Sequence, residues 1–143
     1  MSEKYYITTP IYYPSGRFHI GTAYTTVLAD TMKKYRKLKG YDTYLLTGTD
    51  EHGQKIQNKA EELGKTPQQY VDEMAQMAKD LWKTMNIDYD QFIRTTDEKH
   101  VKVVEKIFEE NKDTFNRVNT FMFQNTYEYV IINDYKNNTH KFY

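Results

Sequence analysis

Runs of apolar residues with the period of a strand recur in the first 110 residues and predict three β-strands. Residues 6–9 are mostly β-branched or aromatic, and Pro10 ends this run because proline has no N–H to give to a sheet. Residues 41–47 predict a second strand that breaks at Gly48. Residues 91–94 predict a third, shorter strand.

Between the first two strands, apolar residues recur at steps of three and four, which is the period of an amphipathic helix. We expect this helix to begin at Thr22 and to end near Leu38, with Gly40 as its terminator. Its apolar positions are Ala23, Val27, Leu28, Thr31, Tyr35 and Leu38. The basic residues between 33 and 39 are interpreted as its solvated face.

Two more helices are predicted before the third strand. One has apolar positions at Ile56, Ala60 and Leu63 and stops at Gly64. The next opens with Thr66 as N-cap and Gln69 as the partner in a capping box. Its stripe of Met and aromatic positions, which we interpret as core packing, contains Tyr70, Met74, Ala78, Leu81, Trp82 and Met85. Strands that alternate with helices predict an α/β fold with a parallel sheet and right-handed crossovers.

The composition changes at residue 111. A capping box at 95–98 precedes a helix that runs to about Phe108, but residues 111–143 hold seven of the nine asparagines and no Gly, Ala, Leu or Pro. Only 126–135 is strand-like in that part. We therefore divide the chain into 1–110 and a divergent tail, 111–143, whose composition suggests a changed reading frame in the gene.

Charge and composition exclude several classes of protein. Twenty basic and 20 acidic residues balance, so no overall positive field indicates nucleic-acid binding. The chain has no cysteine, which excludes disulfides and cysteine-ligated zinc within it. No apolar stretch approaches the length of a membrane span, so we expect a cytoplasmic protein that does not contact a membrane.

Candidate site residues follow the first two predicted strands. His19 and Gly21 stand at the start of a helix, where free N–H groups and the helix dipole favour phosphate, and Gly21 leaves room for a flat purine. The alternative for His19 is an ordinary histidine near a turn. Asp50 suits an α-ammonium group; the alternative is that it caps the helix that begins near Gln54, and both roles could coexist. His52 belongs to the site or caps that same helix.

In a parallel sheet, candidate residues that follow the first two strands are expected to meet beyond the carboxyl ends of those strands, where ligands bind. The stretch that contains them, PIYYPSGRFHIGT at 10–22, resembles the first signature of class I aminoacyl-tRNA synthetases. TGTDEHGQKI at 47–56 and DQFIRTT at 90–96 resemble the methionyl-tRNA synthetase family in particular. The resemblance runs from about Lys4 to about Glu110 and implies the first half of a Rossmann-like catalytic domain.

The resemblance also implies substrates and site residues. The family activates methionine with ATP, accompanied by Mg²⁺, and transfers it to the 3′ end of tRNA. By position, the side-chain pocket for methionine would comprise Pro10, Ile11 and Tyr13, with Asp50 at its amino group. His19, Gly21 and Thr22 would be the catalytic residues at the ATP. Because the chain has no cysteine, we expect no zinc and no other resident metal in it.

Two departures from the family pattern set the expected activity. The signature usually ends in histidine, where this chain has Thr22. The resemblance also ends before the second half of the nucleotide fold and its KMSKS loop, so we expect the chain alone to be inactive. Two alternatives stay open: another class I synthetase or a nucleotidylyltransferase, and a non-catalytic fragment that self-associates through an exposed sheet edge.

Overall fold

The computed structural model describes residues 2–112, and the chain divides into two compact units after Asp97, which are described separately. The first unit contains β1 (Lys4–Thr8), α1 (Ile20–Leu38), β2 (Asp42–Thr49), α2 (Gln54–Glu62), α3 (Pro67–Thr84) and β3 (Gln91–Arg94). The described part of the second unit contains α4 (Glu98–Glu110). The expected elements up to residue 110 are all found, with ends shifted by a few residues.

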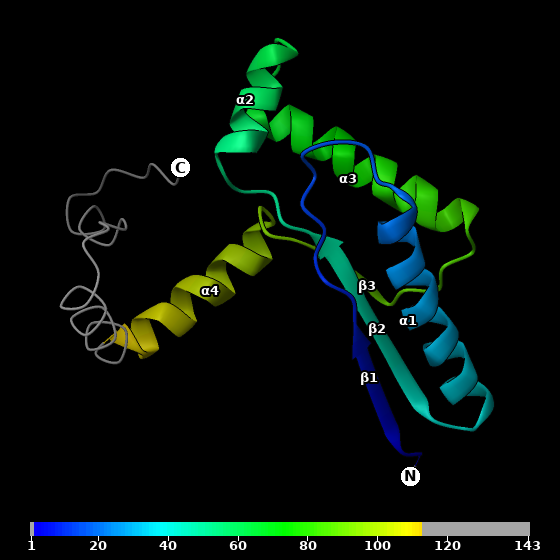
Figure 1. The fold of residues 1–143 in the computed structure, drawn as a ribbon. Helices are drawn as coiled ribbons and strands as arrows, with labels where there is room; N and C mark the ends of the chain where they lie inside the picture. Colours follow the sequence, from blue (N-terminus) through cyan, green and yellow to red (C-terminus); the bar gives the residue numbers. More distant parts are fainter. Residues whose placement is uncertain (1, 113–143) are drawn as a thin grey trace, which may run out of the picture. The chain divides into compact units, whose positions relative to one another are not determined.

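The three strands form one parallel sheet in the order β1-β2-β3, as expected (Figure 1). Ile7 of β1 stands opposite Leu45 of β2, and Leu46 stands opposite Gln91 of β3. β2 is therefore the central strand, and the polypeptide leaves all three strands at the same edge of the sheet. This edge is the one at which a Rossmann-like fold binds its ligands.

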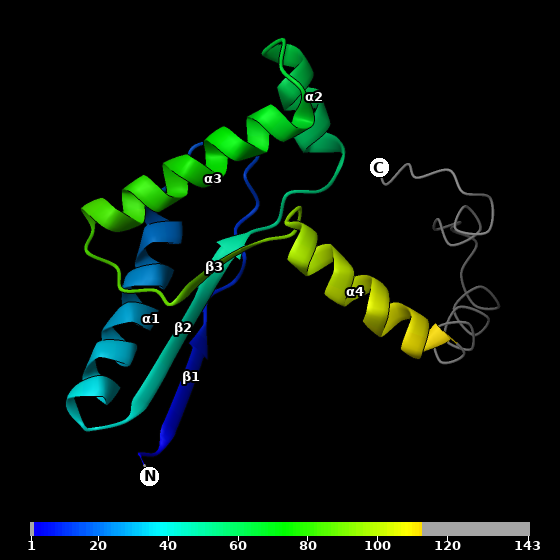
Figure 2. The same ribbon diagram turned by 180° about the vertical axis from the view of Figure 1, so that it is seen from behind.

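Helices α1 and α3 pack against one face of this sheet (Figures 1 and 2). Ala29 of α1, Leu45 of β2 and Trp82 of α3 form the buried core of this layer. Ile7 and Phe92 from the two outer strands pack against it. Side chains alternate between the faces of a strand, so their neighbours along the chain point away from these helices.

The other face of the sheet carries exposed aromatic side chains. Tyr6 of β1 and Tyr44 of β2 stack with 5.8 Å between ring centroids and are 61% and 40% exposed. Within the described residues of the first unit, no helix packs over this pair. A large apolar surface of this kind is typical of a face that contacts further protein.

Helices α2 and α3 share a second small core. Thr66 caps α3 through Gln69 in a reciprocal capping box, as predicted. The Met and aromatic stripe of α3 is buried at Tyr70, Met74, Ala78 and Trp82, which confirms its role in packing. The core that the two helices share consists of Ile56 and Ala60 of α2 with Tyr70, Val71 and Met74 of α3, and Phe18 packs against it.

Two features of the strands and helices differ from the sequence prediction. Gly48 does not end β2 but lies inside it. The residue is a glycine because β3 approaches closely: an ideal Cβ at this position would lie 2.0 Å from the carbonyl oxygen of Ile93. The glycine thus permits strand contact and does not break the strand.

The predicted faces of α1 were also wrong. Its buried side includes Thr22, Thr26 and Lys33, whereas the predicted apolar face is largely exposed. Lys33 is 2% exposed because its ammonium lies 2.8 Å from Asp90 and 3.2 Å from Asp88, in the loop before β3. Buried polar contacts, which apolar periodicity does not detect, set the orientation of this helix.

The exposed side of α1 contains Ile20, Tyr24, Val27, Leu28, Met32, Tyr35 and Leu38, and we call it the outer face of α1. In the second unit, α4 has no buried residue along its described length. The predicted strand at 126–135 lies outside the described residues, and the division at residue 110 stays a prediction. None of the helices among residues 2–112 has both the length and the apolarity needed to cross a membrane.

Candidate active site at the carboxyl edge of the sheet

The loop after β1 stays hydrogen-bonded to β2, and to the residue after it, as far as Asp50. Thr9 donates its N–H to Leu46 O at 3.0 Å, and Tyr12 donates to Gly48 O at 2.9 Å. Asp50 then donates its own N–H back to Tyr12 O at 3.0 Å. The two predicted site segments are therefore joined through their backbones at the sheet edge.

His19 is the N-cap of α1 and not merely a residue near a turn. Its Nδ1 accepts a hydrogen bond from the N–H of Gly21 at 3.0 Å. In the neutral ring the proton consequently resides on Nε2, which is the free donor of an exposed side chain. This arrangement leaves one imidazole N–H at the positive end of a helix dipole, where it suits a phosphate oxygen.

Gly21 is required by the imidazole itself. An ideal Cβ on this residue would lie 2.9 Å from Cε1 and 3.1 Å from Nδ1 of His19. We expected the missing side chain to make room for a purine, and the structure shows that it first makes room for the capping ring. A larger residue would displace His19 from the first turn of α1.

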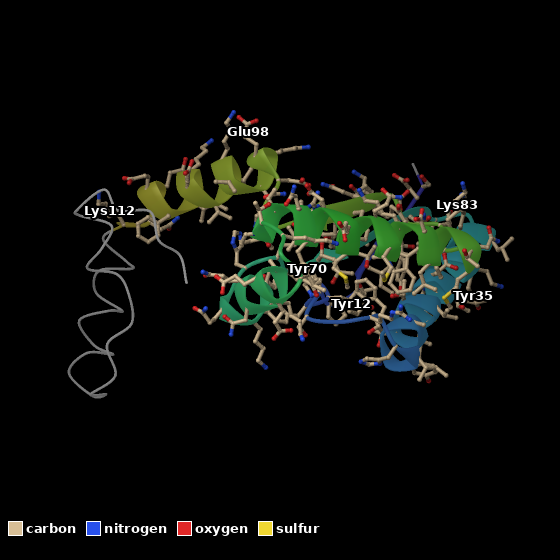
Figure 3. The ribbon with its side chains drawn as sticks, turned by 90° about the horizontal axis from the view of Figure 1, so that it is seen from above. Tyr12, Tyr35, Tyr70, Lys83, Glu98 and Lys112 are labelled. Atoms are coloured by element: carbon tan, nitrogen blue, oxygen red, sulfur yellow. The ribbon has the colours of Figure 1, made fainter. Side chains whose placement is uncertain are left out.

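Aromatic and polar contacts fix the loop that links β1 to α1. Tyr12 forms a 2.7 Å hydrogen bond between its hydroxyl and that of Thr26 in α1. Its ring also lies 6.0 Å from that of Trp82. Farther along the loop, Tyr70 of α3 donates to Pro14 O at 2.9 Å; Tyr12 and Tyr70 are labelled in Figure 3. The loop is thus held from both helices that cover the sheet.

Asp50 is half-buried and does not cap α2. The N-cap of α2 is Gly53, which has no side-chain capping bond, so the capping alternative for both Asp50 and His52 was wrong. The Nε2 atom of His52 instead forms a 3.3 Å hydrogen bond with Thr95 O. Gly53 has φ +120°, and the hydroxyl of Tyr13 lies 2.8 Å from the place of a Cβ there.

The predicted methionine pocket and ATP residues differ in exposure. Pro10, Ile11 and Tyr13 are exposed along the loop that follows β1. Thr22 is buried, and its carbonyl oxygen accepts from the hydroxyl of Thr26. Residues 2–112 include no cluster of three or more His, Asp or Glu side chains suited to a metal ion.

Sequence reasoning missed Glu51, the residue after Asp50. It is 3% exposed, and its Oε1 accepts from Arg94 Nε at 2.8 Å. This hydrogen bond raises the pKa of Arg94 against the opposing effect of burial. Arg94 also donates to Asp72 at 2.6 Å and thereby lowers the pKa of that carboxyl. In the sequence, Glu51 looks like any acidic turn residue, because Arg94 and Thr96, which bond to its carboxylate, are more than 40 positions away.

Comparisons with known proteins show which family the sequence is similar to. The sequence model of the family described as tRNA synthetases class I (M) matches residues 5–137. The chain is 61% identical over 120 residues to the methionine–tRNA ligase of Clostridium acetobutylicum, covering 80% of this chain and 19% of that one. It is 64% identical over 110 residues to the methionine–tRNA ligase of Streptococcus pneumoniae serotype 4, covering 76% and 16%.

A solved structure of a methionyl-tRNA synthetase is also similar to this chain. The Mycobacterium tuberculosis methionyl-tRNA synthetase in complex with methionyl-adenylate superimposes with a TM-score of 0.74 at 32% identity. That superposition covers 79% of this chain and 22% of the other. The chain therefore spans about a fifth or less of the length of these relatives.

Proposed function

Because the chain belongs to the family of class I tRNA synthetases (M), we propose that it is the methionine- and ATP-binding first part of a methionine–tRNA ligase. One observation carries this proposal. The backbone hydrogen bond between Asp50 and Tyr12 joins the amino-acid segment to the loop that ends in the His19 cap of α1. This connection supports a carboxylate and a phosphate seat at one edge of one sheet.

The proposed reaction has two steps. A carboxylate oxygen of methionine attacks the α-phosphorus of ATP, supplied with Mg²⁺, and the bond to the pyrophosphate oxygen breaks. The resulting adenylate then transfers its methionyl group to the 3′ end of tRNA and releases AMP. In such a reaction the protein acts mainly by positioning the reactants and stabilising charge.

Asp50 is proposed to bind the α-ammonium group of methionine. The half-buried carboxylate follows the central strand, and it is not engaged as a helix cap. A charge-assisted hydrogen bond of this kind contributes about 1.5–3 kcal/mol. Pro10, Ile11 and Tyr13, exposed on the neighbouring loop, are proposed to line the pocket for the thioether side chain.

His19, Gly21 and Thr22 are proposed to act at the ATP. Nδ1 of His19 is used by the helix, so its Nε2–H is the group that would donate to a phosphate oxygen. Gly21 contributes by allowing that ring position. Thr22 is buried in the first turn of α1, and it is proposed to act at the ATP from there.

The proposal is tested with a hybrid enzyme. Residues 4–110 of this chain, from the start of β1 to the end of α4, replace the matching segment of the Clostridium acetobutylicum ligase. We expect ATP–pyrophosphate exchange that depends on methionine and not on leucine, isoleucine or cysteine. Exchange that depends on another amino acid would indicate a different class I synthetase, and a folded hybrid without exchange would contradict the proposal.

The 143-residue chain by itself is proposed to lack this activity and to self-associate. Among the described residues β1 pairs only with β2, so its other edge and the outer face of α1 are open to another molecule. Light scattering after size exclusion should show a species larger than a monomer. Since tRNA is aminoacylated where translation takes place, we also propose a cytoplasmic location, which cell fractionation tests.

A further inference from the structure

We propose that Glu51 is a positioning residue for methionine binding, which acts through the neighbouring Asp50; this inference rests on the proposed function. Glu51 is a buried carboxylate immediately after the residue assigned to the ammonium group. Its contacts connect the carboxyl end of β2 to the carboxyl end of β3. The inference concerns how the site is held in place, since Glu51 itself is assigned no contact with substrate.

Both carboxylate oxygens of Glu51 are used. Oε1 accepts from the hydroxyl of Thr49 and from Arg94 Nε, and Oε2 accepts from the hydroxyl of Thr96. The N–H of Glu51 donates to Thr95 Oγ1 at 2.8 Å. A buried carboxylate is costly unless it is paired in this way. The arrangement therefore holds Arg94, the last residue of β3, and the two residues that follow it against Glu51, just beyond the end of β2.

Asp50 is consequently fixed from two sides. Its N–H is held by Tyr12 O on the β1 side, and the next residue is held by Thr95 and Arg94 on the β3 side. Arg94 is itself anchored to Asp72 of α3. A displacement of about 1 Å in a reacting group can cost about 100-fold in rate, so this double attachment bears directly on the site.

A second buried ion pair provides a matched control. Lys33 contacts Asp88 and Asp90 before the start of β3, and Asp90 Oδ2 also accepts from the N–H of Leu45. Glu51 and Lys33 are thus both buried charges that connect the neighbourhoods of β2 and β3. Only Glu51 does so at the end that carries Asp50. A purely structural role predicts similar effects of removing either charge.

The test compares Glu51→Gln and Lys33→Met in the hybrid enzyme and in the complete 143-residue chain. In the hybrid, we expect Glu51→Gln to raise the KM for methionine about 10- to 100-fold while the KM for ATP changes less than threefold. Lys33→Met should leave both KM values unchanged at temperatures where each variant is folded. Arg94→Gln should reproduce Glu51→Gln, and the double variant should be no worse than either, because the two side chains act as a pair.

Amide hydrogen exchange in the 143-residue chain gives a readout independent of activity. Glu51→Gln should accelerate exchange at residues 50 and 51, whose N–H groups are bonded to Tyr12 and Thr95, more than at residues 43–46. Equal changes in the methionine KM for Glu51→Gln and Lys33→Met, or unchanged exchange at residues 50 and 51, would overturn the inference. If the unsubstituted hybrid fails to use methionine, the proposed function fails, and hydrogen exchange still decides whether Glu51 holds the segment.

Discussion

The backbone N–H of Asp50 donates to the carbonyl oxygen of Tyr12 at 3.0 Å, which ties the end of β2 to the loop after β1. This bond extends the parallel pairing of the two strands beyond their regular ends, through the bridge between Tyr12 and Thr49. As a result, the two segments of the candidate site are joined through their backbones. Substitutions at either segment should therefore affect binding without separating the strands.

Replacement of Asp50 should strongly reduce methionine activation without changing the fold. In the hybrid enzyme, Asp50→Asn and Asp50→Ala should lower kcat/KM for methionine by at least about 10- to 100-fold, which corresponds to about 1.5–3 kcal/mol. ATP–pyrophosphate exchange measures the loss, and thermal unfolding should stay close to that of the unsubstituted hybrid. Asp42→Asn, at the exposed beginning of the same strand, is the control. Near-normal exchange in Asp50→Ala would show that the ammonium assignment is wrong.

Replacement of Gly21 should act on the His19 cap. In Gly21→Ala the new methyl group would meet the imidazole at 2.9 Å, so the ring must shift and we expect the capping bond to be lost. The lost cap costs about 1 kcal/mol of stability, and in the hybrid we expect a higher KM for ATP. Gly16→Ala is the matched control, because a Cβ there meets nothing within 4 Å. An unchanged KM for ATP would argue against a phosphate contact from His19.

Replacement of Gly48 should separate β2 from β3. The Cβ of Gly48→Ala would lie 2.0 Å from Ile93 O, and backbone cannot yield as a flexible side chain does. Overpacking of this kind costs about 1–3 kcal/mol or more, which urea unfolding of the 143-residue chain measures. The same Gly16→Ala control applies. A stability equal to that of the control would mean that the two strands are less closely packed than described.

The stabilising effect of Lys33 should depend on pH in a defined direction. Burial lowers the pKa of Lys33, but hydrogen bonds and charges from Asp90 and Asp88 outweigh it and raise that pKa above the ordinary value of 10.5. The hydrogen bond with Lys33 lowers the pKa of Asp88 below 3.8. The ion pair therefore stabilises the fold between about these two values and loses its effect as either group becomes neutral.

Lys33→Met measures this effect. Between pH 5 and 9 it should lower the free energy of unfolding by about 2 kcal/mol, since hydrogen bonds to charged groups contribute about 1.5–3 kcal/mol. The difference from the unsubstituted chain should shrink below pH 3.8 and above pH 10.5. Lys59→Met breaks an exposed pair with Glu62 and should leave the free energy of unfolding nearly unchanged. A pH-independent difference for Lys33→Met would contradict the assignment.

The sequence was sufficient for the order of elements because each carries a local signal. The Thr66 capping box, the positive-φ glycines at the ends of α1 and α2, and the buried stripe of α3 are all features of short windows. The parallel sheet follows from the alternation of strands and helices, and with it the position of the segments after β1 and β2 at one edge of the sheet. The roles of individual side chains there stay predictions.

The failures share a physical cause, which is that the deciding contact is distant in sequence. Lys33 was assigned to a solvated face because Asp88 and Asp90 lie 55 or more positions away. Gly48 looked like a strand end because Ile93, which needs the space, lies on another strand. Glu51 escaped notice for the same reason, since the position of Arg94 becomes relevant only once the sheet is formed.

The enclosed ammonium group of Lys33 has a practical consequence. An amine that is held between two carboxylates and shielded from solvent is out of reach of acylating reagents while α1 stays in place. Its neighbours Lys34 and Lys37 on the same helix are open to labelling. Labelling of these lysines, measured by mass spectrometry, can therefore follow unfolding of this part of the protein. Modification of Lys33 would show that α1 has separated from the sheet.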